Sequence, residues 1–533
     1  MNLQAQPKGR LQTALRARLV DEQTLIVALG AAIILVMLAH FAFLTVYPPV
    51  FIDEPWFSNA TWTWLKTGVN FDAIHAGVLD QFGYAWVRRP FLGELPWLIS
   101  FATLGLGLFQ ARLVSWIFGG LLLVLTIVVG RQSYSRVTGL LAALMLSLSP
   151  SFLQASHYAR PDILLAAVVM LAFSLATLGF EREKWWAHAL AGLLIGLSPD
   201  FHPNGILFAP ALAGVYLAAY GFQVLRQKGT WLCFLGGLIG IIYYAGLHIL
   251  PSPSAYFTLY SLNVAGPQTS LLNALNPMSL LTATAAEYAR YHFYANNLDF
   301  AVVGASLAYI AVRRSKADRY LLSFVAISLV CFAVYPWKKT DLYAILLYPF
   351  FMLMAAETLG GLIRAGQAAG RQQIFAGGLL LLFLFSSALH VARPFYDNKD
   401  YNYYAAASQI RQVIPANARV LGSPLWWLGL PDYDYRSTHG LRPYQFFNGY
   451  SLTKSLNVIR PDYLIVDPIL HWTLVDAPYL PPGLDADVFQ MPSVGINQEL
   501  ADFLTQHAKL VLEFTDAWHG LVQVYAIHWD SGS

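Results

Sequence analysis

The sequence predicts a polytopic α-helical membrane protein of about eleven transmembrane helices, followed by a C-terminal soluble α/β domain. Of its 533 residues, 57% are hydrophobic and only 12% are charged, whereas an ordinary soluble protein carries roughly 25% charged residues. Long apolar runs recur up to about residue 391, and the composition then changes sharply. The net charge of +3 gives no bulk attraction to nucleic acid, so we expect no nucleic-acid partner.

The apolar runs have the length that a membrane-spanning helix needs, which is about 20 residues. The first run, Leu25–Val46, is too long for a removable signal peptide and lacks its small-residue cleavage site. The others lie at about 112–130, 137–155, 162–180, 187–200, 204–222, 231–250, 298–312, 320–336, 341–359 and 374–391. Pro199, Pro203 and Gly205 interrupt the pair between 187 and 222.

Basic residues alternate between the loops, and this alternation predicts the orientation. The N-terminus and the loops on its side hold Lys8, Arg10, Arg16, Arg18, Arg131, Arg136, Arg182, Lys184, Arg226, Lys228, Arg313, Arg319, Arg364 and Arg371. Because basic loops face the cytoplasm, we expect a cytoplasmic N-terminus, and an odd number of spans then places the C-terminus outside. We expect a multi-pass protein of a bacterial plasma membrane.

Three outer segments are long enough to carry structure of their own. The first outer loop covers about 47–110, and its apolar stretch Phe91–Phe109 predicts helices that lie in the membrane interface. A later loop covers 251–297. The tail, 392–533, reads as a separate domain after the membrane module 1–391. Its patterns predict helices near 403–413 and 498–508, and strands near 419–423, 462–467, 510–514 and 521–528.

Charged clusters fall at the outer ends of the predicted spans, where ionisable groups are costly and therefore point to function. The first is Asp53–Glu54, just past the first span, and the second is His157–Asp162 with its Arg160. A third, Asp200–Asn204, contains His202. All three also fit a plain structural role as helix caps or a polar loop. Their shared face favours a common site.

Cations gather on the same face, against the trend that places positive charge inside. They are Arg88, Arg89, Arg290, Lys338 and Lys339. An anionic headgroup or a phosphate ligand would favour them there, since Arg binds phosphate through two hydrogen bonds and Lys as a point charge. The alternative is ordinary snorkelling of long side chains toward lipid headgroups.

Taken in order, these motifs resemble the GT-C superfamily of glycosyltransferases that use polyprenyl-phosphate sugars. Protein O-mannosyltransferases and lipid A aminoarabinose transferases are the members most similar. The resemblance covers about residues 20–390 and is carried by Asp53-Glu54, Arg88-Arg89-Pro90, Ala111-Arg-Leu-Val-Ser115, His157–Asp162 and Pro336–Tyr343. The tail, with Ile414-Pro and Arg460–Asp467, looks like the outer domain of many bacterial members. The sequence has no P-loop, HExxH or GxSxG motif that would compete with this reading.

The resemblance implies an inverting transfer of a hexose or pentose from a polyprenyl-phosphate-linked donor to an acceptor hydroxyl on a glycan, lipid or protein at the outer face. Asp53 maps onto the general base, since an attacking hydroxyl must lose its proton to a nearby carboxylate. Glu54 and Asp162 are the other catalytic candidates. The substrate-binding candidates are Arg88, Arg89, His157, Arg160, His202, Lys338, Lys339 and Tyr343, and membrane lipids are the remaining partners.

One departure from the family leaves a metal ion open. Aminoarabinose transferases carry an acidic or His residue associated with metal in the first loop, whereas this chain has Arg88 there. No cofactor is certain, and a divalent metal ion stays an open expectation. Two competing classes are a lipid or glycan transporter, which would place charges at the bilayer midplane between inverted repeats, and a non-catalytic membrane scaffold.

Overall fold

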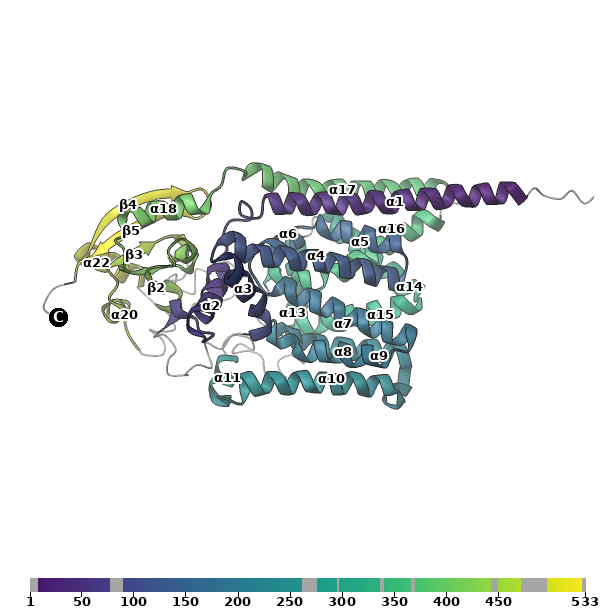
Figure 1. Cartoon of the computed structure of the whole chain (residues 1–533), viewed down its shortest axis with the longest axis horizontal. Helices are drawn as coiled ribbons and strands as arrows, with labels where there is room; N and C mark the ends of the chain where they lie inside the picture. The colour runs from purple at the N-terminus through teal and green to yellow at the C-terminus, as the bar shows by residue number, and fades with distance from the viewer. Residues whose placement is uncertain are drawn as a thin grey trace, which may run out of the picture.

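The computed structural model describes residues 8–76, 90–260, 276–294, 297–335, 340–365, 370–441, 449–470 and 496–529. A bundle of long helices forms the larger part, and an α/β domain sits at one end of it (Figure 1). Four cations of the sequence prediction lie outside the described residues, namely Arg88, Arg89, Lys338 and Lys339.

Within the described residues, twelve helices of the bundle follow the predicted apolar runs. They are α1 (Lys8–Ala42), α4 (Leu108–Ser133), α5 (Arg136–Ser147), α6 (Pro150–His157), α7 (Asp162–Arg182), α8 (Trp185–Leu197), α9 (Phe208–Tyr220), α10 (Lys228–Tyr244), α14 (Asn297–Arg313), α15 (Lys316–Val334), α16 (Tyr348–Ala365) and α17 (Gly370–Asp397). Helices α5 and α6 bend by 72° at their junction. Pro150 begins α6, and a proline cannot continue the hydrogen bonding of the preceding helix.

The predicted count of eleven spans is not confirmed. Among the described residues, seven helices are long and apolar enough to cross a membrane, or eight if the bent α5–α6 pair is one span. The remaining runs fold as α8, α14 and α16, which are 13, 17 and 18 residues long. The turns that contain Pro199 and Pro203 follow the end of α8, and a separate element, η8 (Asp341–Leu346), covers the start of the run predicted at 341–359.

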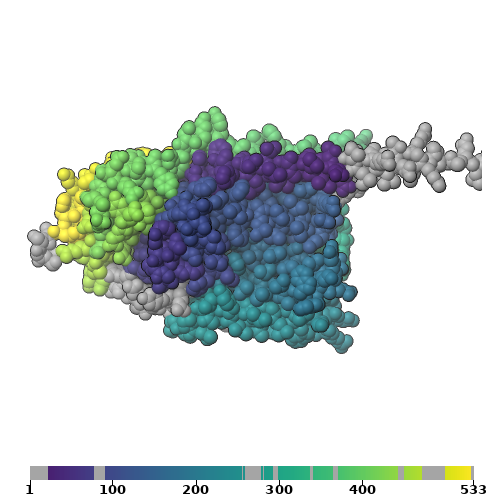
Figure 2. All heavy atoms as spheres, viewed as in Figure 1, coloured from purple at the N-terminus to yellow at the C-terminus, as the bar shows by residue number. Residues whose placement is uncertain are grey.

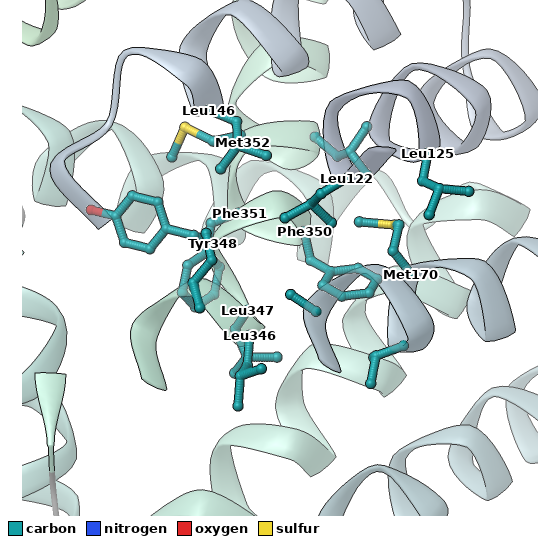
Figure 3. Close-up of a cluster of buried hydrophobic side chains, with 14 of the residues drawn as sticks. Leu122, Leu125, Leu146, Met170, Leu346, Leu347, Tyr348, Phe350, Phe351 and Met352 are labelled. Carbon is teal, nitrogen blue, oxygen red and sulfur yellow. The ribbon is translucent and has the colours of Figure 1, made fainter. Parts of the chain in front are cut away.

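The core of the bundle lies around α7 and α16, which are buried on nearly every face. Figure 3 shows Leu122, Met170 and Phe350, from α4, α7 and α16, turned toward one another. The ring of Phe350 lies 5.4 Å from that of Phe173 and 4.8 Å from that of Phe324. In a lipid environment such contacts stabilise through close packing rather than through removal from water.

Glycines allow α8 and α10 to approach closely. A methyl group added at Gly192 would collide with the carbonyl of Cys233, and one at Gly236 with the carbonyl of Ala189. Gly196 and Gly240 meet one helical turn further along. Two small-xxx-small pairs therefore face each other, which is the pattern that lets membrane helices pack backbone to backbone.

A buried ionic cluster closes the bundle end that is remote from the α/β domain. Arg313 donates to both carboxylate oxygens of Asp318, at 2.7 and 2.6 Å, and to Glu357 at 2.6 Å. Tyr134 donates to Asp318 at 2.8 Å, and Thr138 donates to Glu357 at 2.9 Å. These bonds tie together the ends of α4, α5, α14, α15 and α16.

Further helices and 3-10 turns cover the other end of the bundle. They are α2 (Asp53–Thr67), η1 (Ala73–His75), α3 (Phe91–Leu104), η3 (Ser198–Asp200), η4 (Pro203–Leu207), α11 (Pro253–Tyr260), α13 (Pro277–Tyr294) and η8 (Asp341–Leu346). The predicted apolar stretch 91–109 folds as α3, which ends where Gly105 takes a positive φ of 83°. Asp53–Glu54, Asp200–Asn204 and Arg290 lie among these elements, whereas His157–Asp162 covers the end of α6 and the start of α7.

The C-terminal domain is a five-stranded sheet with helices, in the strand order β2-β1-β3-β5-β4. Its elements are α18 (Tyr403–Val413), β1 (Arg419–Gly422), η10 (Pro424–Gly429), β2 (Asp434–Ser437), η11 (Thr438–Gly440), α20 (Leu452–Ile459), β3 (Tyr463–Val466), α22 (Ile496–His507), β4 (Ala508–Asp516) and β5 (Gly520–Ile527). β1 pairs in parallel with β2 and β3, while β5 pairs antiparallel with β3 and β4. The predicted helices and strands are all present, whereas β2 and α20 were not predicted.

Candidate active site

Glu54 lies in a saturated, fully buried ion pair. Both its side chain and that of Arg112 are 0% exposed. Arg112 Nε donates to Glu54 Oε2 at 2.9 Å, and Arg112 Nη2 donates to Oε1 at 2.7 Å. The backbone N–H groups of Ala159 and Phe51 donate to the same two oxygens, at 3.0 and 2.8 Å. Four donors therefore occupy the carboxylate, which leaves it no room to take a proton from a substrate.

The other N–H groups of Arg112 bind the turn that leads into α2. Arg112 Nη1 donates to the carbonyls of Leu44 and Pro48, at 2.9 and 2.8 Å, and Nη2 to that of Pro49 at 3.2 Å. A buried guanidinium is stable only when its donors are satisfied, and here they are. The pair thus joins α4, the start of α2 and the turn before α7.

Asp53, the preceding residue, lies in a more open cluster. Arg160 forms an ion pair with Asp53 on one side, and its Nε donates to Asp162 Oδ2 at 2.8 Å on the other. The side chain of Asp53 keeps 23% of its surface exposed, against 4% for Asp162. Within the described ranges no donor reaches Asp162 Oδ1, although His202 Nε2 lies 4.0 Å away.

His202 faces this cluster from the turn between η3 and η4. Its Nδ1 accepts the backbone N–H of Asn204 at 3.2 Å, so the neutral ring carries its proton on Nε2, toward Asp162. Burial lowers the pKa of His202 to about 4, and Arg160 adds to this effect while Asp162 opposes it. The ring is therefore neutral at pH 7. Tyr343 packs edge-on against it, with 5.1 Å between the ring centres.

Asp200, two residues earlier, holds the start of α3 against the site. Its carboxylate accepts the N–H groups of Phe91 and Leu92 at 2.9 and 3.2 Å, and His248 Nε2 donates to it at 2.7 Å. Gly93 makes the approach close, because a methyl group there would lie 2.8 Å from the Phe201 carbonyl oxygen. The helix that follows the Arg88-Arg89-Pro90 motif thus begins beside His202.

His157 is fully buried beneath the cluster, and both of its ring nitrogens have protein partners. Nδ1 lies 2.6 Å from the Tyr47 carbonyl, and Nε2 lies 3.0 Å from Nδ1 of His40. Its ring also stacks on Phe395. The sequence placed His157 among the substrate-binding candidates, but this geometry places it against the turn before α2.

Arg290 on α13 combines a buried charge with free donors. It is 2% exposed, pairs with Glu287, and lies over the rings of Tyr291 and Phe332 at 5.8 and 5.4 Å. Its Nε and Nη1 have no hydrogen-bond partner in the described part of the chain. From the sequence Arg290 was one of the predicted outer cations, but it was not among the predicted site residues.

A cavity of about 310 Å³ opens beside Arg290, between α13, α14, α15 and α16. Glu287 and Tyr291, which flank Arg290 in the sequence, line it together with Val303, Leu307 and Phe351. Its wall is almost entirely apolar. The sequence could not indicate this cavity, because four different helices line it. The apolar pattern of one helix does not show which other helices its buried side faces.

The described residues contain no cluster typical of a metal site. Among the described residues, no three His, Cys, Asp or Glu side chains come together as ligands to one ion. Arg160 pairs with both Asp53 and Asp162.

Known proteins resemble the chain in part of its sequence and in nearly all of its fold. Residues 89–245 match the model of the dolichyl-phosphate-mannose-protein mannosyltransferase family. No curated protein sequence matches the chain at a significant level.

Among solved structures, ArnT from Cupriavidus metallidurans bound to undecaprenyl phosphate superposes with a TM-score of 0.60 at 14% identity, covering 94% of this chain and 97% of that one. The Archaeoglobus fulgidus oligosaccharyltransferase in its apo form superposes with a TM-score of 0.52 at 15% identity, covering 82% and 69%. The same archaeal enzyme in complex with an inhibitory peptide and a dolichol-phosphate gives a TM-score of 0.51 at 14% identity, covering 93% and 74%. The chain thus has the fold of the GT-C glycosyltransferases, as its motifs predicted.

Proposed function

We propose that this protein is an inverting glycosyltransferase that moves a sugar from a polyprenyl-phosphate-linked donor to an acceptor hydroxyl at the outer face of the membrane. The observation that carries the proposal is the contrast at α2: Glu54 is saturated, while the adjacent Asp53 keeps an accessible carboxylate beside Arg160, Asp162 and His202. The GT-C fold and the lipid phosphates bound by two of its structural neighbours support the choice of donor.

Asp53 is the general base of this mechanism. The acceptor hydroxyl gives its proton to Asp53 while its oxygen attacks the anomeric carbon of the donor sugar. The bond from that carbon to the lipid phosphate oxygen breaks on the opposite side, which inverts the configuration. The electron pair leaves with the lipid phosphate, a stable anion that needs a cation rather than a strong acid.

The neighbouring residues orient this base and receive the substrates. Asp162 holds the guanidinium of Arg160, and Arg160 in turn orients Asp53. His202, neutral at pH 7, and Tyr343 form the wall nearest to these charges and contact the sugar. We propose that Glu54 and His157 hold the backbone that precedes α2. The motifs had implied a catalytic role for Glu54 and a substrate-binding role for His157.

Two places are available for the donor phosphate. The family motif favours Arg89, with Lys338 or Lys339 as the runner-up and Arg88 beside it, all of which lie outside the described residues. A second candidate is Arg290, a buried guanidinium with free N–H groups on α13, the helix that also supplies Glu287 and Tyr291 to the wall of the cavity. A charged donor beside an apolar cavity matches a lipid phosphate, because the guanidinium binds the headgroup and the cavity takes isoprene units.

The test is an assay of the purified protein with a panel of polyprenyl-phosphate sugars. We expect transfer from at least one donor, release of free lipid phosphate in equal amount, and a product of inverted anomeric configuration by NMR. Movement of intact donor across vesicle membranes without cleavage would instead support the transporter class, which no contact in the described parts of the chain favours.

A further inference from the structure

The backbone that leads into α2 is fixed by a row of carbonyl contacts. The carbonyl of Tyr47 faces His157 Nδ1, those of Pro48 and Pro49 accept from Arg112, and that of Val50 accepts from His519. Four consecutive carbonyls are therefore held by three side chains. Two of these belong to the membrane bundle, whereas His519 belongs to the turn between β4 and β5 of the C-terminal domain.

His519 is oriented for this contact by its own domain. Asp516 Oδ1 accepts His519 Nδ1 and the His519 backbone N–H, both at 2.8 Å. The opposite ring nitrogen, Nε2, lies 3.3 Å from the Val50 carbonyl oxygen. Burial raises the pKa of Asp516, but the hydrogen bonds from His519 and Trp518 outweigh it and hold this pKa below its ordinary value. Asp516 therefore fixes the orientation of the His519 ring.

The same face of the domain is bound to the first outer loop by packing. Val50, Ile74 and Leu108 share one buried cluster with Tyr403 and Trp426. Leu108 N–H donates to Tyr404 Oη at 2.8 Å, and Arg436 Nη1 donates to the Ala76 carbonyl at 3.3 Å. Figure 2 shows the green and yellow spheres of the domain against the purple end of the bundle. The docking therefore does not depend on His519 alone.

We propose that His519 is a positioning residue, through which the C-terminal domain fixes the carbonyl three positions before the general base. This inference rests on the proposed function, in which Asp53 is that base. Without His519, Val50–Ile52 is held on the bundle side only, and Asp53 is presented to the acceptor in productive geometry for less of the time. The donor phosphate is bound by other side chains, so the loss falls on turnover and not on donor affinity.

The experiment compares His519→Ala, His519→Gln and a control, His528→Ala. His528 is exposed in the same domain, while a glutamine amide at 519 can still donate to Val50. With the donor found by the panel assay, His519→Ala should lower kcat about 3- to 10-fold at nearly unchanged donor KM, as expected for one lost hydrogen bond. His519→Gln should recover most of the rate, and His528→Ala should match wild type.

Hydrogen exchange of the amides from Phe51 to Glu54 gives a second readout that needs no activity. His519→Ala should exchange faster there, with unchanged protection at Leu108 and in β5. Equal exchange and equal kcat in His519→Ala would overturn the proposal, and so would faster exchange over the whole docking face, which would make His519 a docking residue. If the panel yields no transfer, the proposed function fails, while the exchange pattern still decides whether His519 holds this segment.

Discussion

Asp53 and Glu54 are adjacent in the sequence but lie in opposite surroundings. Four donors surround the carboxylate of Glu54, and its side chain is 0% exposed. Asp53 shares one guanidinium with Asp162 and keeps 23% of its side chain exposed. Two adjacent positions of α2 thus hold a carboxylate with a structural role and a carboxylate that is accessible to a substrate.

The difference follows from which way each side chain leaves the first turn of α2. Successive helix positions point about 100° apart, so two neighbours cannot serve the same face. Glu54 points into the bundle, where Arg112 comes from α4 and Ala159 from the turn before α7. The two adjacent acidic residues therefore have different roles. A substitution of Glu54 should lower stability, whereas one of Asp53 should lower the transfer rate.

Replacing Glu54 should have the largest effect of all. Glu54→Gln leaves the buried Arg112 without its counter-charge, and breaking such a pair costs roughly 3–5 kcal/mol of folding free energy. We expect a large drop in the denaturant midpoint of the purified protein, with Asp53→Asn at nearly wild-type stability as the matched control. If the Glu54→Gln protein were as stable as wild type but had no turnover, Glu54 would be a catalytic residue.

Replacing Asp53 should have the next largest effect, and on the rate alone. Asp53→Asn removes the proton acceptor, which should lower transfer by at least about 10²-fold while donor binding stays intact. Single-turnover kinetics and lipid-donor binding on the same preparation separate the two quantities. A wild-type rate in this variant at equal protein would show that Asp53 is a helix cap.

Arg290 differs from both carboxylates, because it is a buried charged group that keeps free donors. The double change Glu287→Gln with Arg290→Met keeps the buried site neutral, and it should weaken donor binding about tenfold or more through the lost charge-assisted contact. The exposed Arg314, changed to Ala, is the control. Unchanged donor affinity would show that Arg290 does not bind the donor phosphate. Arg89 would then be the leading candidate, and the donor affinity of Arg89→Ala would test it.

The smallest predicted effect is a pH dependence at His202. Its pKa of about 4 in the folded protein is below the ordinary 6.5, so the unfolded chain binds more protons between these values. Stability should therefore fall as the pH drops from about 6.5 toward 4. His202→Gln should show a shallower fall in unfolding temperatures measured at pH 7.5 and 5. Parallel curves for the two proteins would mean that His202 is not buried as described.

The sequence predicted well whatever depends on local composition. Charges stand out in an apolar chain, and this exposed the Asp53, Arg160 and Asp162 cluster. Amphipathic periodicity likewise located α18 and the longer strands of the C-terminal domain. β2 was missed because its four residues, Asp434–Ser437, are mostly polar, whereas the equally short β1 and β3 are mostly apolar. α20 was missed because it is only eight residues long, although one of its faces is apolar.

What the sequence could not show is pairing across the chain. Arg112 was visible only as part of a motif opening a span, yet it binds Glu54, which is 58 positions away. The cavity beside Arg290 is formed by four helices, and the partner of Val50 lies in the last hairpin. Such contacts depend on how the helices and strands pack together. An apolar pattern indicates which side of a helix or strand is buried, but it does not indicate which other element covers that side.

The contact between His519 and Val50 also bears on how the protein matures in the cell. The two residues are 469 positions apart, so the last of the four carbonyls stays unheld until the ribosome has passed residue 519 and the β4–β5 hairpin has closed. By then the bundle helices have already been synthesised. The segment that carries the base is thus completed late. If synthesis stops before the β4–β5 hairpin has been made, the chain can insert into the membrane, but its active site stays unfinished.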